Sequence, residues 1–169
     1  MKIIRKISIA LLFGIFACKG GAKDKSASHT LKDREIDKIR LKDLNGEPIR
    51  LEKYKGKTIF INFWATWCKP CIEEMPTIEK AQNILQNEEV IFLLASGETA
   101  EEINVFRNTH DYVFNYARIE NSEELNIQTL PTTFIFNPEG KLIFSEMGYR
   151  KWDEKNNIDM IRKTANKNE

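Results

Sequence analysis

Apolar and polar residues alternate over residues 39–51, and Asn45-Gly46, a dipeptide typical of tight turns, interrupts the alternation. This pattern predicts a small β-hairpin. Residues 58–64 (TIFINFW) form a run of β-branched and aromatic side chains, which predicts a central strand. A second apolar run over residues 90–95 predicts another buried strand.

Helical spacing begins directly after the first of these strands. The apolar positions that recur there at intervals of three or four residues are Ile72, Met75, Ile78, Ala81 and Leu85. They predict a helix over residues 68–86, and Pro76 inside it is expected to produce a kink. Two further helices are predicted over residues 100–108 and 151–164.

The remaining pattern completes an α/β order. Residues 114–119 predict a short strand, followed by a helical turn over residues 122–125. Residues 132–136 and 141–145 flank an Asn-Pro-Glu-Gly turn and predict a second hairpin. A β-α-β half thus precedes a β-β-α half. This order predicts a mixed central sheet with helices on both faces and the N-terminal hairpin as an addition.

The first residues differ in composition from the rest of the chain. The basic residues at the start are Lys2, Arg5 and Lys6, and a nearly continuous apolar stretch over residues 7–17 follows them. This stretch is shorter than the ~20 residues that span a bilayer and matches the apolar core of a secretory signal. Cys18 and a polar segment come next, so the leader resembles a bacterial lipoprotein signal. We expect residues 1–17 to be a signal peptide and Cys18 to carry the lipid; an ordinary signal peptide that contains a cysteine is the alternative.

Composition places one folded domain behind this leader. Residues 18–36 are small, polar and charged, and they predict a flexible tether before a domain over residues 37–169. The chain has 169 residues, of which 41% are hydrophobic and 30% charged, enough for one domain with a core. The formal net charge of +1 argues against a general affinity for nucleic acid. The expected location is extracytoplasmic, at a membrane surface.

The candidate chemistry lies where the central strand meets the long helix, in Cys68-Lys69-Pro70-Cys71. The unpaired N–H groups and the positive end of the helix dipole favour the thiolate of Cys68, and a thiolate is the nucleophile in disulfide exchange. The two-residue spacing places Cys71 one turn along, where it can attack the mixed disulfide and release the partner. Pro70 supports the first helical turn and stiffens the loop. Cys68 is thus predicted to attack and Cys71 to resolve.

A zinc site is the competing interpretation of a Cys-x-x-Cys motif. Closed zinc sites need two further cysteine or histidine ligands. Cys18 belongs to the leader, and His29 and His110 are not in a ligand-like spacing. A purely structural disulfide is also disfavoured, because closing so short a loop removes little entropy from the unfolded chain. We expect no metal, and no cofactor beyond the redox-active disulfide Cys68–Cys71.

Three segments carry a resemblance to a known family. Residues 63–71, Phe-Trp-Ala-Thr-Trp-Cys-Lys-Pro-Cys, resemble the active-site segment of the thioredoxin superfamily. Residues 44–57 resemble the N-terminal hairpin of its membrane-anchored TlpA/ResA/DsbE-like branch, and residues 130–140, Leu-Pro-Thr-Thr-Phe-Ile-Phe-Asn-Pro-Glu-Gly, resemble the second signature of that branch. The resemblance extends over about residues 37–164. It implies a thioredoxin fold.

The same resemblance implies extracytoplasmic dithiol–disulfide exchange with protein thiols and disulfides, usually as a reductant and often in cytochrome c assembly. The implied partners are apocytochrome c and a membrane thiol reductase that donates electrons. An oxidant or isomerase of secreted proteins is the alternative within this chemistry, because the motif does not set the direction of electron flow. Two other classes are a peroxide-reducing enzyme and a non-catalytic binding module. The lone cysteine with an upstream threonine and proline expected of the former is absent, and the cysteines together with Trp67 and Pro131 argue against the latter.

Residue roles follow from the resemblance as well. In the superfamily the residue matching Pro131 follows a cis peptide bond and faces the active-site disulfide. A proline lacks an N–H, which leaves the backbone of Leu130 free to pair with an extended substrate segment. A plain trans proline at a strand start is the alternative. Substrate contact is expected of Trp67, Pro70, Leu130, Pro131 and Glu98, the last by its resemblance to an acidic residue near the ResA-type site.

Glu74 lies three residues after Cys71, and so on the helical face turned toward the cysteines. In ResA-like proteins a glutamate at the matching position lies beside the cysteines and assists proton transfer. Such a carboxylate can accept the proton of Cys71 as it attacks, and partial burial would raise its pKa toward the working range. Asn62 stands where thioredoxin carries a buried acid, so we expect Glu74 to supply that function. A solvent-exposed helix charge is the alternative, and it is what we expect of Glu73.

Overall fold

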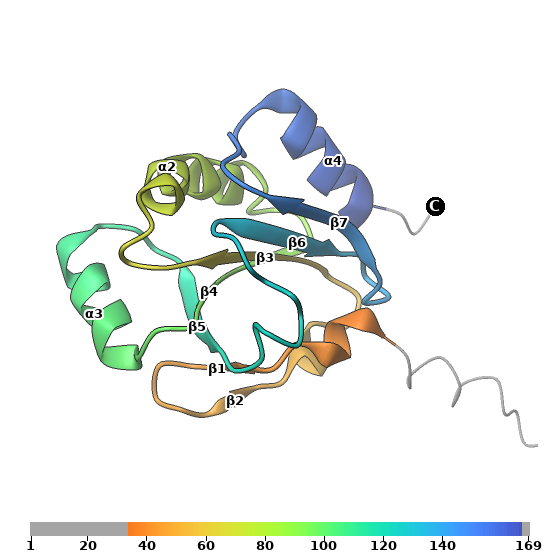
Figure 1. The fold of residues 1–169 in the computed structure, drawn as a ribbon. Helices are drawn as coiled ribbons and strands as arrows, with labels where there is room; N and C mark the ends of the chain where they lie inside the picture. The colour runs from red at the N-terminus through yellow and green to blue at the C-terminus, as the bar shows by residue number, and fades with distance from the viewer. Residues whose placement is uncertain (1–33, 167–169) are drawn as a thin grey trace, which may run out of the picture.

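The computed structural model describes residues 34–166. Seven strands form one mixed sheet in the order β2-β1-β5-β4-β3-β6-β7 (Figure 1). The strands are β1 (Leu41–Lys42), β2 (Pro48–Ile49), β3 (Thr58–Trp64), β4 (Val90–Ser96), β5 (Asn115–Ile119), β6 (Thr132–Phe136) and β7 (Leu142–Met147).

The strand β3 lies inside the sheet, parallel to β4 and antiparallel to β6. All seven of its residues are buried, because other elements cover both faces of the sheet. The predicted central strand over residues 58–64 is therefore confirmed. β4 is also parallel to β5, so the carboxyl ends of these three strands meet at one edge of the sheet. Such an edge is where α/β proteins commonly place their functional groups.

The predicted N-terminal hairpin is confirmed, and it widens the sheet. β1 pairs with β2 in antiparallel register, with Leu41 opposite Ile49. Gly46 in the connecting turn has a φ of 90°, a conformation that residues with a side chain rarely adopt. Leu41 is also paired with Ile119 of β5, which fastens the hairpin to the rest of the sheet.

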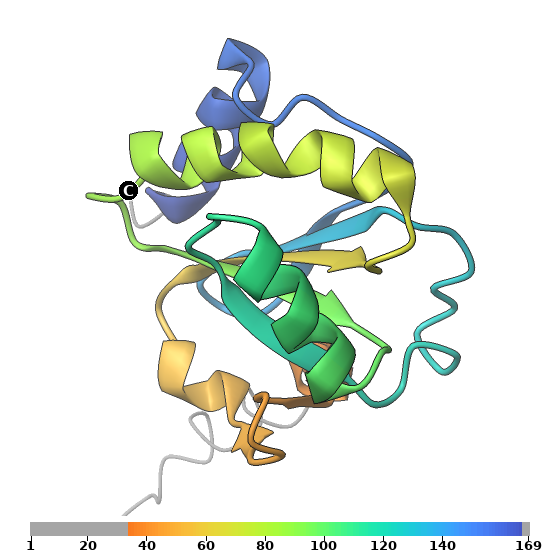
Figure 2. The ribbon, with the colours of Figure 1, turned by 90° about the vertical axis from the view of Figure 1, so that its left-hand side faces the viewer.

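Three α-helices pack against one face of the sheet: α2 (Lys69–Ile84), α3 (Ala100–Thr109) and α4 (Lys155–Ala165). The connections β3-α2-β4 and β4-α3-β5 step across the sheet in the same direction, and right-handed crossovers then place both helices on the same side. All three helices contribute to one hydrophobic cluster with the sheet. Figures 1 and 2 show α4 next to α2 on this side.

Shorter elements cover the other face. The 3-10 helices η1 (Glu35–Lys38) and η2 (Leu51–Tyr54), with the segment between β5 and β6, enclose a second hydrophobic cluster that includes Phe63. Helices are thus present on both faces, as predicted, but those of this face are single 3-10 turns. The chain crosses this face in its N-terminal segment and in the return from β5 to β6, and neither has the apolar periodicity of a long helix.

The helix α4 begins at Lys155, whereas the sequence predicts its start at residue 151. The side chain of Trp152 is buried in the cluster between the sheet and the helices. Its backbone N–H donates to Thr77 Oγ1 (3.1 Å) rather than to a helical carbonyl. Burial of this side chain therefore keeps the connection from β7 to α4 out of the helix. α2 continues through Pro76 to Ile84. The other predicted strands and helices are present within a few residues of their predicted bounds, and the predicted helical turn over residues 122–125 is present as a turn closed by the Leu125 N–H on the Asn121 carbonyl.

The leader, Cys18 and most of the predicted tether lie outside the described residues. The signal peptide over residues 1–17 and the tether over residues 18–36 remain predictions. η1 begins at Glu35, so regular structure starts within the last residues assigned to the tether. Among the helices of residues 34–166, none is long and apolar enough to cross a membrane.

Candidate active site

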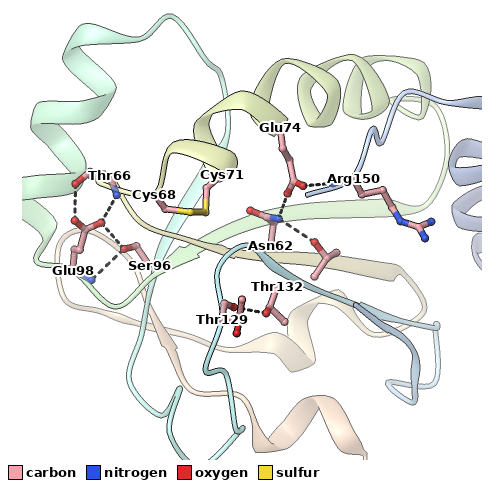
Figure 3. Close-up of a disulfide and its surroundings, with 11 residues drawn as sticks. Asn62, Thr66, Cys68, Cys71, Glu74, Ser96, Glu98, Thr129, Thr132 and Arg150 are labelled. Carbon is pink, nitrogen blue, oxygen red and sulfur yellow. Dashed lines mark hydrogen bonds between the residues drawn. A yellow bond between two sulfur atoms is a disulfide. The ribbon is translucent and has the colours of Figure 1, made fainter. Parts of the chain in front are cut away.

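The disulfide Cys68–Cys71 lies at the start of α2, directly after the turn that follows β3 (Figure 3). Cys68 is the N-cap residue of the helix, and its carbonyl accepts the N–H groups of Cys71 (3.0 Å) and Ile72 (3.1 Å). Pro70 occupies the first turn, where a missing N–H removes no helical hydrogen bond. The local sequence thus builds a helix start that holds the two sulfur atoms together.

The motif combines buried sulfur atoms with exposed neighbours. Cys71 is 0% exposed and Cys68 is 4% exposed, whereas the adjacent Trp67 is 74% exposed. Pro70 is exposed as well. The accessible approach to the disulfide is therefore on the side of Cys68, and Cys71 is shielded behind it.

The peptide bond between Leu130 and Pro131 is cis, as predicted. Pro131 is buried, Leu130 is half-buried, and the Pro131 carbonyl accepts the N–H of Gly148 (2.7 Å). β6 begins directly afterwards at Thr132, which lies opposite Phe63 of β3. The cis-proline loop therefore lies at the edge of the sheet from which the Cys-Lys-Pro-Cys segment departs.

Glu74 is fully buried and points from α2 toward the sheet (Figure 3). Its Oε1 accepts a hydrogen bond from Asn62 Nδ2 on β3 (2.6 Å), and its Oε2 accepts the backbone N–H of Arg150 (2.8 Å). Asn62 Nδ2 also donates to Thr133 Oγ1 on β6 (3.0 Å). Glu73 is exposed. An exposed helix charge therefore describes Glu73 and not Glu74.

Burial raises the pKa of the Glu74 carboxyl from 4.5 to about 7, because an ionised carboxylate loses its hydration there. The hydrogen bonds from Arg150 and Asn62 oppose this rise in pKa, since they stabilise the charged form, while the negative charge of Glu146 adds to it. The indole N–H of Trp152 also lies near the carboxylate and stabilises its charge, although its geometry falls short of a hydrogen bond. Glu74 can therefore take up and release a proton near neutral pH.

Glu98 follows β4 and binds the turn that leads into Cys68. Its carboxylate accepts the Thr66 N–H (2.7 Å), the Thr66 hydroxyl (2.6 Å) and the Ser96 hydroxyl (2.9 Å). Figure 3 shows this network on one side of the disulfide and the Glu74 network on the other. The carboxylate predicted to contact substrate thus also holds the backbone of the active-site turn.

A pocket of about 600 Å³ opens beside this turn, where the carboxyl ends of β3, β4 and β5 meet the segment that precedes β6. Trp67, Glu98 and Leu130 line it, whereas Pro70 and Pro131, also predicted to contact substrate, do not. Much of the remaining lining is apolar or small, namely Phe63, Ala65, Ala95, Gly97, Ile119 and Ile127. The pocket can therefore receive an apolar group beside the turn that leads into Cys68.

The described part of the chain, residues 34–166, contains no group of three or more Cys, His, Asp or Glu side chains that could hold a metal ion. The ring of His110 stacks on that of Phe106 with centroids 3.9 Å apart, and His110 Nδ1 lies 3.0 Å from the carbonyl oxygen of Phe106. Cys18 and His29 lie outside the described residues. That the protein uses no metal and no further cofactor stays a prediction.

Several polar residues that complete the site were not identified from the sequence: Thr66, Ser96, Thr133 and Arg150. Thr66 lies two residues before Cys68, and its place directly ahead of the Cys-x-x-Cys motif could have marked it as a turn residue. Arg150 contributes a backbone N–H from a connection without periodic pattern, and no signal in the sequence points to it.

The fold and the site together define a class of protein. A buried strand leads into Cys-x-x-Cys at a helix start, and a cis-proline loop lies at the same edge of a mixed sheet. This is the thioredoxin fold with a dithiol–disulfide site. Residues 33–145 match the model of the AhpC/TSA family, and the chain belongs to that family.

Two individual relatives show which members of the family this chain is similar to. The thiol-disulfide oxidoreductase ResA of Bacillus subtilis is 35% identical over 107 residues, which cover 61% of this chain and 60% of ResA. The thioredoxin-like protein YneN of the same bacterium is 36% identical over 105 residues, which cover 59% of this chain and 62% of YneN. The matched segments thus span less than two thirds of the length of these relatives.

A solved structure agrees on the architecture. A thiol:disulfide interchange protein from Bacteroides sp. aligns with a TM-score of 0.64 at 23% sequence identity. The alignment covers 76% of this chain and 88% of that protein. At this level of identity the likeness concerns the fold, and the predicted α/β thioredoxin fold is confirmed.

Proposed function

We propose that the protein is a thiol–disulfide oxidoreductase that exchanges electrons with protein partners through Cys68 and Cys71. The observation that carries the proposal is the Cys68–Cys71 disulfide at the start of α2, with the buried carboxyl group of Glu74 on the same helix. Such a pair can cycle between dithiol and disulfide, and the carboxyl group can carry a proton that the cycle moves. The name of the relative ResA supports the same chemistry.

In the reducing direction the cycle starts from the dithiol. The thiolate of Cys68 attacks one sulfur of a partner disulfide, so that a bond to the partner forms and the second partner sulfur leaves as a thiolate. Cys71 then loses its proton and attacks the sulfur of Cys68, which forms the Cys68–Cys71 disulfide and expels the first partner sulfur. The partner gains two electrons and two protons. One proton comes from the ionisation of Cys68 and the other from Cys71 through Glu74.

The pocket and the cis-proline loop are the proposed docking region for the partner. An extended partner segment would pair with the backbone at Leu130, before Pro131, where the missing N–H of proline ends further pairing. A side chain beside the partner cysteine would enter the pocket of about 600 Å³, whose lining suits an apolar group. The exposed Trp67 would cover the partner next to Cys68.

We propose reduction as the direction of electron flow, with apocytochrome c as partner and a membrane thiol reductase as electron donor. Glu74 supports this direction. Its negative charge on the same helix as the cysteines disfavours a thiolate there, and a reduced state without strong thiolate stabilisation has a low reduction potential. A strongly oxidising protein would need the opposite arrangement.

The reduction potential tests this direction. We expect a value near or below that of thioredoxin, about −270 mV. It can be measured by equilibrating the protein in dithiothreitol buffers of graded redox ratio and counting alkylated cysteines by mass. A value near about −120 mV would identify an oxidant and overturn the proposal. Steady consumption of hydrogen peroxide without reduction of a disulfide such as that of insulin would point instead to a peroxidase.

We further propose that the domain works outside the cytoplasm on a lipid anchor at Cys18. The apolar stretch over residues 7–17 and the cysteine that follows it support this location. Cys18→Ser is expected to release the protein from membranes or to block its processing, and fractionation of cells followed by immunoblotting measures both. Cys68→Ser is the control, because it should remain with the membranes. Unchanged membrane association of Cys18→Ser would contradict the anchor.

A further inference from the structure

The backbone N–H of Arg150 is a part of the Glu74 site that comes from far along the chain. It donates to Glu74 Oε2 at 2.8 Å across 76 residues of sequence. Arg150 lies in the connection between β7 and α4, so neither a strand ladder nor a helix fixes the direction of this N–H. Something else must hold it, because a hydrogen bond weakens steeply when its donor turns away.

The side chain of Arg150 is anchored at several points. Its Nε and Nη2 donate to the two carboxylate oxygens of Glu146 at 3.1 and 2.5 Å, and its Nη1 donates to Asn157 Oδ1 at 2.5 Å. The guanidinium also lies 5.1 Å from the ring centre of Phe144 and 5.6 Å from that of Trp152. These contacts fix the residue whose N–H binds Glu74.

Asn157 anchors the same connection a second time. It is 6% exposed, and its Nδ2 donates to the carbonyl of Lys151 at 2.7 Å. On the other side, Thr77 Oγ1 of α2 accepts the N–H of Trp152 at 3.1 Å. The backbone is therefore held immediately after Arg150 by groups from both α2 and α4.

We propose that Arg150 and Asn157 are positioning residues for Glu74. Their side chains hold the backbone N–H of Arg150 against the carboxylate of Glu74. This inference deepens the proposed function and rests on it for its role in exchange. The carboxylate is worth positioning because a fixed donor stabilises its charged form and so lets it accept a proton at the working pH.

The other groups around Glu74 can change its pKa through their charge as well as through the position of a hydrogen-bond donor. Asn62 on β3 is neutral and donates directly to the carboxylate, and the Trp152 indole lies near it. Glu146 on β7 is the nearby negative charge, and Arg150 neutralises it by an ion pair. Removal of the Arg150 side chain would therefore change the pKa of Glu74 in two ways, by releasing the Arg150 N–H and by leaving the charge of Glu146 unpaired. Removal of the uncharged Asn157 side chain changes this pKa only through the position of the Arg150 N–H.

The test is a measurement of the pKa of Glu74. It is obtained from carbon NMR of the Glu74 carboxyl group as a function of pH, in the oxidised full-length protein. Asn157→Ala is expected to raise this pKa by about half a unit to one unit, because the donor to the charged form becomes less fixed. Hydrogen exchange of the Arg150 amide should become about tenfold faster in the same variant. Asn156→Ala, on the exposed part of the same helix, is the matched control and should behave as wild type.

Arg150 variants separate the two mechanisms even if Asn157→Ala is poorly folded. Arg150→Ala should raise the pKa of Glu74 most, and Arg150→Lys should raise it as well, because lysine keeps the charge but cannot form the fork to Glu146 and Asn157. A wild-type pKa in Arg150→Lys or in folded Asn157→Ala would overturn the proposal. Neither measurement needs a partner, so the outcome is independent of whether the protein exchanges disulfides.

Discussion

The Cys71→Ala variant is expected to accumulate partners as stable mixed disulfides, whereas the Cys68→Ala variant is expected to form none. Cys68 lies next to the 74% exposed Trp67, while Cys71 is fully buried, so a partner disulfide meets Cys68 first. Without Cys71 no second thiol among the described residues, 34–166, can attack the new disulfide bond, and the intermediate persists. Turnover should fall by on the order of 10³-fold or more in both variants, because each lacks a sulfur that forms a bond in the cycle.

The measurement is non-reducing electrophoresis of cells that express each full-length variant, with dithiothreitol releasing the trapped partners. Both variants lose the same short disulfide, so the effect of its loss on stability is common to both. A difference in trapping therefore reports on the chemistry and not on folding. The double variant Cys68→Ala/Cys71→Ala is the control for capture of partners through Cys18. Equal trapping by the two single variants would show that the roles of Cys68 and Cys71 are assigned wrongly.

The oxidised protein is expected to lose stability as the pH rises from 4.5 to about 7, and Glu74→Gln is expected to remove that loss. The pKa of Glu74 is about 7 in the folded protein and close to 4.5 in the unfolded chain. Between these values the unfolded chain releases the proton while the folded protein keeps it, so rising pH favours unfolding. The effect is absent below the lower value and complete above the upper one, where it amounts to about 3 kcal/mol.

Urea unfolding of the oxidised protein at pH 5, 6, 7 and 8 measures this window. Glu74→Gln should show a nearly constant free energy of unfolding across it. At pH 5 the variant should be less stable than wild type by roughly 1–3 kcal/mol, because the glutamine NH₂ group must face a donor, either the Arg150 N–H or the Asn62 amide. Glu73→Gln is the control and should follow wild type. If Glu74→Gln also follows wild type, the pH dependence arises elsewhere.

The same variant should alter the thiol chemistry in two opposite ways. Loss of the negative charge favours the thiolate, so the pKa of Cys68 should fall. Loss of the proton acceptor slows the deprotonation of Cys71, so the reduction of a protein partner should become slower. The pH dependence of Cys68 alkylation, beside the rate of exchange, measures both. Wild-type values of both quantities would leave Glu74 without a part in exchange.

The features that could be predicted from the sequence are those whose cause is local. The strand β3 follows from an uninterrupted run of β-branched and aromatic residues, and α2 from apolar residues at helical spacing. Cys71 and Glu74 face the same side because three residues separate them on one helix. The cis bond before Pro131 was implied by the resemblance of its segment and not by any spacing in this chain.

The contacts that complete the site could not be predicted, because they join elements that are distant in the sequence. Arg150 meets Glu74 across 76 residues, and Asn62 meets Thr133 across 71 residues. The start of α4 was placed too early for the same reason, since burial of Trp152 against other elements ends the helical pattern before residue 155. A local pattern carries no information on which loop will lie over which helix.

The sequence by itself thus determined the order of strands and helices, the redox pair and the carboxyl group beside it, since local spacing dictates each of them. The tertiary structure alone decided how deeply Glu74 is buried, which raises its pKa to about 7, and which groups donate hydrogen bonds to it, which limits that rise. It also decided that Glu98 holds the active-site turn and that a pocket opens beside Trp67. Hydration and hydrogen bonding depend on what surrounds a group in space, and that surrounding exists only after the chain has folded.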